Sequence, residues 1–186
     1  MKNKRKLAVF DMDGTLFDTA EVNYYSYAEA AKKLEYHIGK QKFMNIFVGK
    51  NYREFLPEFG IIRESELDKI HELKKEFYPK FLEKAKKNDV LFELIESLKR
   101  DYIIGLATTA SKKNVSDILQ CFEVKEKFDF IITQEDTVKL KPDPECYLLS
   151  MEKAGVLARD TIIFEDSEVG LEAARLSGGY VVKVSM

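Results

Sequence analysis

The sequence predicts an α/β fold, in which a doubly wound parallel sheet of the Rossmann-like type carries an inserted all-helical cap domain. Three observations lead to this prediction. Five short apolar segments have the length and composition of buried strands. Apolar residues at helical spacing separate the later segments, and residues 16–86 contain no strand pattern at all.

The five candidate strands are residues 7–10, 102–107, 130–132, 161–164 and 180–184. Helical spacing recurs between them in three stretches: residues 90–98, 115–122 and 147–154. Strands that alternate with helices form parallel βαβ units, so a single sheet with helices on both faces is expected.

The region between the first two strands has a different pattern. It carries two apolar stripes at helical spacing between charged faces, which are Ala28, Ala31 and Leu34, then Ile70, Leu73, Phe77 and Phe81. We therefore expect a Rossmann-like core of residues 1–15 and 87–186, and a helical insertion of residues 16–86.

The composition is that of a globular protein, with 45% apolar and 33% charged residues. A net charge of -2 gives no general attraction to nucleic acid, and the basic opening from Lys2 to Lys6 is interpreted as a solvated terminus. The sequence has no apolar run of the length that a membrane span or a signal peptide needs. We expect a cytoplasmic protein without nucleic-acid or membrane partners.

Two carboxylates one residue apart follow the first strand. Asp11 comes directly after the apolar run, and Asp13 precedes Gly14, which permits a tight turn, and Thr15, which can hydrogen-bond back into it. Ligands of open α/β sheets bind outside the carboxyl ends of the strands, where Asp11 would lie. The alternative is an Asx turn that closes an ordinary strand.

Polar side chains also follow the second and fourth predicted strands and stand before a later predicted helix. The second strand is followed by the hydroxyls of Thr108 and Thr109, the fourth by the carboxylates of Glu165 and Asp166, and Lys141 stands before a proline at a helix start. Each has an ordinary explanation as a turn, a cap or a solvated lysine. In this order and spacing, they together predict a phosphoryl-transfer site.

With these motifs the chain resembles, over nearly its whole length, the haloacid dehalogenase-like hydrolase superfamily and its branch of β-phosphoglucomutase-like phosphatases. The matching motifs are Asp11 to Thr15, Thr108, Lys141 with its Pro-Asp-Pro, and Glu165 to Ser167 followed by Gly170 to Ala174.

The resemblance implies roles for these residues. Asp11 would be the nucleophile that forms an aspartyl-phosphate, and Asp13 the general acid and base. Thr108 and Lys141 would hold the phosphoryl group, to which the neighbouring hydroxyl of Thr109 is also assigned.

It also implies a magnesium site. Asp166 would bind Mg²⁺ together with Asp11 and the backbone carbonyl of Asp13, while Glu165 would be an auxiliary acid.

By the same resemblance, residues 16–86 are a helical cap. The segment from Phe47 to Arg53 resembles the part of the cap that faces the substrate, so Lys50 and Arg53 are candidates for substrate specificity; a solvated turn and helix start is the alternative. Mutase relatives carry a histidine where this chain has Asn23, which counts against mutase activity.

The expected function is therefore a magnesium-dependent phosphatase that acts on a small phosphorylated metabolite, a sugar phosphate or a nucleotide. A sugar-phosphate mutase of the β-phosphoglucomutase type is the enzymatic alternative, and a catalytically idle phosphate-binding or interaction module is the other. A monomer or a weak homo-oligomer is expected.

Overall fold

The computed structural model describes residues 6–47 and 50–186. The chain divides into two compact units: unit 1 comprises Met1–Asp18 and Lys87–Met186, and unit 2 comprises Thr19–Lys86. Most of the basic opening, Lys2 to Arg5, and the pair Val48 and Gly49 of the segment expected to face the substrate lie outside the described residues.

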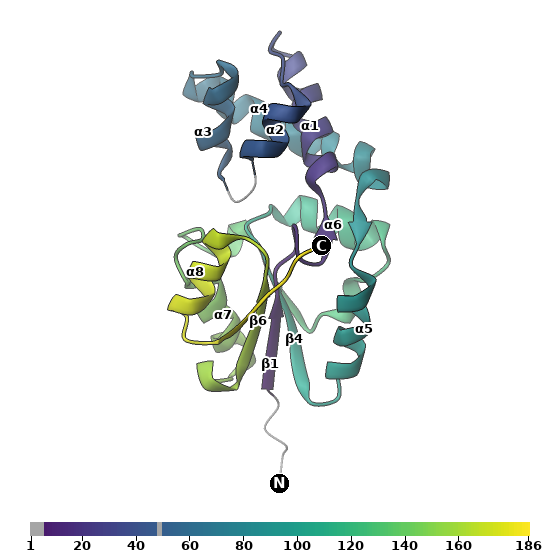
Figure 1. Ribbon diagram of the computed structural model, residues 1–186, viewed down its shortest axis with the longest axis vertical. Helices are drawn as coiled ribbons and strands as arrows, with labels where there is room; N and C mark the ends of the chain where they lie inside the picture. Colours follow the sequence, from purple (N-terminus) through teal and green to yellow (C-terminus); the bar gives the residue numbers. More distant parts are fainter. Residues whose placement is uncertain (1–5, 48–49) are drawn as a thin grey trace. The chain divides into compact units, whose positions relative to one another are not determined.

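Unit 1 is built on a five-stranded parallel sheet with the strand order β5-β4-β1-β6-β7 (Figure 1). Its strands are β1 (Lys6–Phe10), β4 (Tyr102–Ala107), β5 (Phe130–Ile132), β6 (Thr161–Glu165) and β7 (Tyr180–Lys183). Four helices connect them: α5 (Asp89–Leu98), α6 (Lys112–Cys121), α7 (Glu145–Ala154) and α8 (Glu168–Leu176). Short 3₁₀ turns span Lys125–Lys127, Gln134–Asp136 and Ala158–Asp160.

The helices cover both faces of this sheet. From β1 the chain moves outward to β4 and β5, then crosses back to β6 and β7. Right-handed crossovers in these two directions place α5 and α6 on one face and α7 and α8 on the other, as the ribbon shows clearly for α5, α7 and α8 (Figure 1). The predicted doubly wound α/β fold is confirmed.

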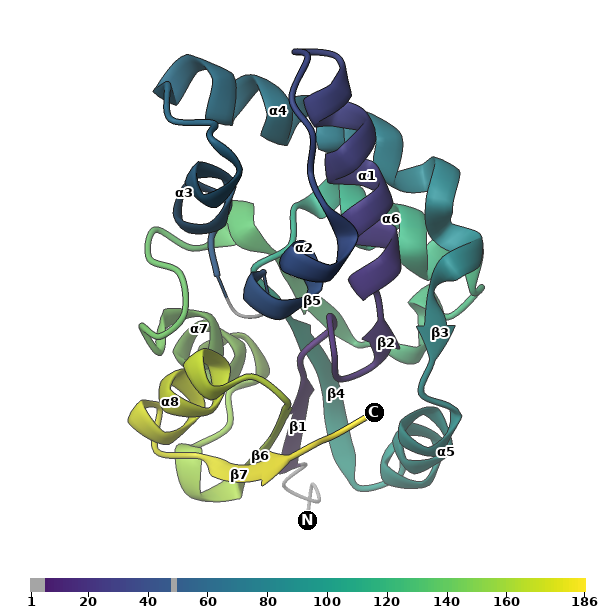
Figure 2. The same ribbon diagram turned by 45° about the horizontal axis from the view of Figure 1, so that its top comes forward.

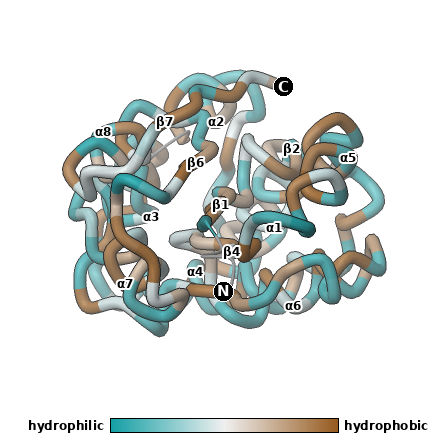
Figure 3. The backbone as a smooth tube through the Cα atoms, turned by 90° about the horizontal axis from the view of Figure 1, so that it is seen from below, coloured by the Kyte–Doolittle hydropathy of each residue, from teal (hydrophilic) through white to brown (hydrophobic). Residues whose placement is uncertain are grey.

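The central strand β1 is apolar because both faces of the sheet are buried there. Leu7 and Val9 of β1 pack with Tyr147 and Met151 of α7 and with residues of α8, while Ala8 and Phe10, which alternate with them, are equally inaccessible. The hydropathy colouring shows α5, α7 and α8 alternating between brown and teal, as expected for helices with one apolar face (Figure 3). The core thus holds β1 rigidly in the centre of the sheet.

The turn after β1 is held by backbone hydrogen bonds from Gly14 N to Phe17 O at 2.7 Å and from Phe17 N to Met12 O at 3.0 Å. Gly14 has a φ of +86°, a conformation that favours glycine. Asn88 ties this turn to the start of α5: its amide donates to the Thr15 carbonyl at 3.1 Å, and its side-chain oxygen caps the helix by accepting from Leu91 N at 3.3 Å.

Unit 2 is helical. Its helices are α1 (Ala20–Lys32), α2 (Lys40–Ile46), α3 (Tyr52–Phe55) and α4 (Glu64–Phe77), with 3₁₀ turns at Leu56–Phe59 and Tyr78–Lys84. Its core is rich in aromatic rings, with Tyr27, Phe43 and Phe55 packed against one another. Because α1 ends at Lys32, Leu34 of the predicted stripe lies beyond the helix.

The expectation of no strand in residues 16–86 was wrong at its two ends. Phe17–Asp18 forms β2 and Lys86–Lys87 forms β3, and the two pair as a separate two-stranded sheet (Figure 2). Each strand is only two residues long, which is too short to produce an alternating pattern. In the part of the chain that the structure describes, no helix is long and apolar enough to span a bilayer.

Phe17 anchors the β1 turn, because its fully buried ring packs at centroid distances of 5.5 Å from Phe92 and 5.0 Å from Phe122. Phe17→Ala should lower the free energy of unfolding by about 3–5 kcal/mol in a denaturant titration. Val182→Ala, at an exposed position of β7, is the control and should change it by about 0.5 kcal/mol or less. Equal effects of the two substitutions would contradict the anchoring role.

Candidate active site

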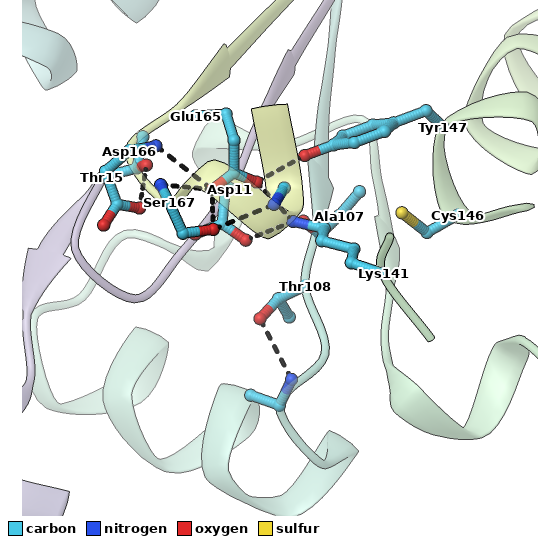
Figure 4. A network of polar contacts seen from close by, with 12 residues as sticks. Asp11, Thr15, Ala107, Thr108, Lys141, Cys146, Tyr147, Glu165, Asp166 and Ser167 are labelled. Carbon is cyan, nitrogen blue, oxygen red and sulfur yellow. Dashed lines mark hydrogen bonds and ion pairs between the residues drawn. The ribbon is translucent and has the colours of Figure 1, made fainter. Parts of the chain in front are cut away.

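The carboxyl ends of three neighbouring strands bring polar side chains together in unit 1 (Figure 4). Asp11 follows β1, Thr108 follows β4, and Glu165 and Asp166 stand at the end of β6. Lys141 reaches the same place from the loop between β5 and α7. The site lies beside β1, where the chain reverses its direction across the sheet, which is where ligands of doubly wound sheets bind.

Lys141 joins two of the carboxylates. Its ammonium donates to Asp11 Oδ1 at 2.7 Å and to Glu165 Oε2 at 2.6 Å. A longer contact of 3.5 Å runs to the Ala107 carbonyl. The Lys141 side chain is only 6% exposed, so this charge acts in a medium of low polarity. Lys141 is followed by a cis peptide bond to Pro142.

Glu165 is the most heavily bonded side chain of the site. Its two oxygens accept five hydrogen bonds: from Lys141 Nζ and Tyr147 OH on Oε2, and from Asp166 N, Ser167 N and Ser167 Oγ on Oε1. Ser167 in turn caps α8 by accepting from Gly170 N at 3.0 Å. A Cβ at Gly170 would stand 2.1 Å from the Glu165 carboxylate, so the glycine of this motif makes room for it.

Asp166 is oriented from the turn after β1. Thr15 Oγ1 donates to Asp166 Oδ1 at 3.0 Å. A Cβ at Gly14 would meet the Asp166 carboxylate at 2.1 Å. Glycine is therefore required at position 14 by two independent constraints, its positive φ and the close approach of Asp166.

The carboxylates of Asp11, Glu165 and Asp166 offer oxygen atoms that all lie within 4.8 Å of one another. If all three are ionised they carry -3 against the +1 of Lys141, which leaves the site at -2. Carboxylate oxygens are the ligands that Mg²⁺ prefers in proteins, and a divalent cation would balance this charge. The donor set therefore fits magnesium.

Burial, and after it the neighbouring negative charge, shifts the pKa values of two carboxylates of the site. Burial and the neighbouring Glu165 raise the pKa of Asp11 well above its usual value, although Lys141 opposes them. Burial and Glu165 likewise raise the pKa of Asp166 to about 6.

The pKa values of Glu165 and Lys141 shift in the directions that favour their charged forms. Burial alone would raise the pKa of Glu165, but the charge of Lys141 and the hydrogen bonds from Lys141, Tyr147 and Ser167 lower it. Burial alone would lower the pKa of Lys141, but the facing Asp11, with Tyr147 and Glu165, raises it well above its usual value. The opposite shifts of these two pKa values favour the ion pair between Glu165 and Lys141, whose charged atoms lie 2.6 Å apart.

Three further residues of the predicted site lie in the turns that follow β1 and β4. Asp13 is half-buried in the turn after β1, where it forms an isolated bridge with Phe17. Thr108 is buried, and its hydroxyl accepts from Ala110 N at 3.1 Å. Thr109 is exposed.

The predicted specificity residues belong to unit 2. The Arg53 guanidinium contacts the carboxylates of Glu64 and Asp68 and the hydroxyl of Tyr52, so it is already engaged within the unit. Lys50 is exposed, and its backbone N–H donates to the Phe47 carbonyl at 3.1 Å.

Asn23 also belongs to unit 2. Its side-chain amide is buried and donates to the carbonyl and the hydroxyl of Thr19, both at 3.1 Å.

Sequence reasoning missed Tyr147. Its hydroxyl donates to Glu165 Oε2 at 2.6 Å, and its ring lies under the Lys141 ammonium. The helical spacing of α7 marked Tyr147 only as a core residue. The available signal was its position six residues after Lys141, on the first turns of the helix that the lysine loop enters.

Comparison with known proteins agrees with this geometry. Residues 8–184 match the family described as haloacid dehalogenase-like hydrolase. The chain is 30% identical over 177 residues to the phosphorylated carbohydrates phosphatase of Thermotoga maritima. The matched region covers 91% of this chain and 80% of that protein. It is also 28% identical over 191 residues to the β-phosphoglucomutase of Bacillus subtilis, and this match covers 96% of the chain and 83% of that protein.

A solved structure has the same fold. CbbY from Rhodobacter sphaeroides, in complex with phosphate, matches with a TM-score of 0.85 at 23% identity, and the match covers 98% of this chain and 87% of that one. The family match extends over nearly the whole chain and includes every strand end that contributes to the site. This chain belongs to the haloacid dehalogenase-like hydrolase family, as its motifs predicted.

Proposed function

We propose that the chain is a magnesium-dependent phosphatase that hydrolyses a small organic phosphate through an aspartyl-phosphate on Asp11. The observation that carries the proposal is the position of Asp11 at the end of the central strand, with the Lys141 ammonium 2.7 Å from its Oδ1 and the Asp166 carboxylate beside it. A carboxylate that attacks a phosphate dianion meets like-charge repulsion, so a site for this reaction must bring positive charge to its nucleophile.

We assign the cation to Asp11, Asp166 and the backbone carbonyl of Asp13. Glu165 is assigned an auxiliary role, because its oxygens already accept five hydrogen bonds within the protein. When bound, Mg²⁺ supplies the positive charge that offsets the repulsion between nucleophile and phosphate.

The reaction then proceeds in two displacements on the protein's own groups. Asp11 attacks phosphorus, the bond to the ester oxygen breaks, and Asp13 gives that oxygen a proton. A water molecule next attacks the phosphorus of the aspartyl-phosphate, Asp13 takes its proton, and the carboxylate of Asp11 is released. Lys141, Thr108 and Thr109 are assigned to the phosphoryl oxygens, and the side chain of Thr108 would have to exchange its bond with Ala110 N for one with the substrate.

Unit 2 is proposed to act as the cap that excludes water during the first displacement and contacts the leaving group. Of its two candidate specificity residues, Lys50 is the better supported, because the guanidinium of Arg53 is held by Glu64 and Asp68. We propose a sugar phosphate or a nucleotide as the substrate. A relative named as a phosphatase of phosphorylated carbohydrates supports the first of these.

A sugar-phosphate mutase is the second candidate, favoured by the relative named as a β-phosphoglucomutase. Asn23 argues against it. An amide cannot relay a proton near neutral pH, and this one is committed to two hydrogen bonds with Thr19.

The nucleophile and the acid-base residue are tested by two matched substitutions. Asp11→Asn should abolish release of phosphate, because a neutral amide does not attack phosphorus. Asp13→Asn should slow it by roughly 10²–10⁴-fold, the usual scale for loss of a general acid and base. Phosphate release from a panel of phosphorylated metabolites, measured with magnesium present, checks both. Substantial turnover by Asp11→Asn would overturn the assignment, and absence of turnover by the unmodified protein across the panel would favour the idle module.

The raised pKa of Asp166 predicts how stability depends on pH and metal. The folded-state pKa is about 6 against a usual 3.8, so ionisation of Asp166 destabilises the metal-free protein as pH rises through about 6. Asp166→Asn keeps the acceptor for Thr15 but removes this charge. In excess chelator at about pH 8, it should raise the free energy of unfolding by on the order of 1–2 kcal/mol, a value reduced for partial exposure.

Two further conditions make this test specific. At about pH 4, where Asp166 is protonated, the variant and the unmodified protein should be equally stable. Added magnesium at neutral pH should stabilise the unmodified protein and do so less for Asp166→Asn, because a ligand is missing. A variant that is less stable than the unmodified protein in chelator at high pH would contradict the charge argument.

The products distinguish the phosphatase from the mutase. With β-glucose 1-phosphate and other sugar phosphates in magnesium buffer, phosphorus NMR should record accumulation of free phosphate. Rapid conversion to a 6-phosphate with little phosphate released would instead establish the mutase.

A further inference from the structure

We propose that Tyr147 is a positioning residue of the proposed reaction: through Glu165 it sets where the Lys141 ammonium stands relative to Asp11. The inference rests on the proposed function for its catalytic consequence. The contacts on which it is built lie wholly within unit 1.

Tyr147 touches both members of the Glu165–Lys141 ion pair. Its side chain is fully buried, its hydroxyl donates to Glu165 Oε2 at 2.6 Å, and the Lys141 ammonium stands 4.9 Å from the centre of its ring. Lys141 Nζ bonds the same Oε2 at 2.6 Å (Figure 4). Hydroxyl and ammonium thus share one carboxylate oxygen.

This sharing decides where the charge of Lys141 is directed. The ammonium is divided between Asp11 Oδ1 at 2.7 Å and Glu165 Oε2 at 2.6 Å. The hydrogen bond from Tyr147 neutralises part of the charge on that oxygen, which weakens its attraction for Lys141 and leaves the ammonium available to Asp11 and to a phosphoryl group. Without the hydroxyl, Lys141 would be drawn toward Glu165 and away from the nucleophile.

The fold supplies both contacts from one short stretch. Lys141 lies in the loop that enters α7, and Tyr147 N donates to the Pro144 carbonyl at 3.0 Å in the first turn of the helix. The ring therefore lies directly below the lysine, where its electron-rich face attracts the ammonium. A phenylalanine at this position would keep the ring and the packing but lose control of Glu165.

Tyr147→Phe tests this directly, since it removes only the hydroxyl. We expect kcat for phosphate release to fall by about tenfold, because a misplaced Lys141 stabilises the developing charge less well. The matched control is Tyr36→Phe in unit 2, which removes a hydroxyl that donates to Glu66 at 2.8 Å. It should leave kcat unchanged, and the thermal midpoints of both variants confirm that they are folded.

A double-mutant cycle separates positioning from simple packing. In Glu165→Gln, the amide oxygen must face the N–H groups of Asp166 and Ser167, which turns the NH₂ group toward Tyr147 and leaves its hydroxyl without this acceptor. If Tyr147 acts through Glu165, adding Tyr147→Phe to Glu165→Gln should cost no further activity. Losses that multiply would show that Tyr147 acts by another route and would overturn the proposal.

The same double-mutant cycle can be measured as thermal unfolding midpoints in excess chelator, a readout that does not require a known substrate. Tyr147→Phe should lower the midpoint by about 2–4 °C in the unmodified background and by much less with Glu165→Gln. Equal shifts in the two backgrounds would overturn the coupling of Tyr147 to Glu165 even if no substrate is known.

The outcomes for function and inference are distinct. An unmodified protein that releases no phosphate contradicts the proposed function, and the unfolding cycle still decides the coupling. An active protein whose Tyr147→Phe variant is equally active leaves the function standing and overturns the positioning role.

Discussion

The organisation of unit 1 depends on one constraint: three carboxylates are gathered at the end of the sheet around a single buried ammonium. Each carboxylate would be costly in this position alone, because burial disfavours the charged form. Lys141 compensates for two of them, since it lies within 2.7 Å of both Asp11 and Glu165. What remains is a deficit of positive charge, and this deficit makes the site receptive to a divalent cation.

The neighbouring features follow from keeping Glu165 in place. The lack of a Cβ at Gly170 leaves room for the Glu165 carboxylate. Ser167 donates to that carboxylate and caps the start of α8. Tyr147 contacts it from the opposite side, from α7. Two helices and the end of β6 therefore converge on a side chain that has no assigned step in the chemistry, and its contribution is to hold the residues that do.

The sequence was sufficient to predict the sheet, because buried parallel strands are continuous apolar runs. It also located Asp11 and Asp166 at the sheet edge, because each directly follows such a run, whereas Lys141 lies in the loop between β5 and α7 and was predicted from its motif. It could not give the hydrogen bond of Tyr147 to Glu165, which joins residues 18 positions apart and depends on how α7 packs against β6. The engagement of Arg53 with Glu64 and Asp68 was hidden for the same reason, because charged residues on separate helices carry no mark of their pairing. The strands β2 and β3 have two residues each, which is too few for an alternation of apolar and polar residues to be recognised in the sequence.

Asn88 gives the site a dependence on a distant part of the chain. Its side chain bonds the carbonyl of Thr15 and caps α5, while the hydroxyl of that same Thr15 holds Asp166. Hydrogen bonds through Thr15 therefore connect Asn88, where the chain re-enters unit 1, with Asp166, a proposed metal ligand. Local unfolding of the first turn of α5 would remove the contact of Asn88 with Thr15, and with it the support for the hydrogen bond that orients the Asp166 carboxylate.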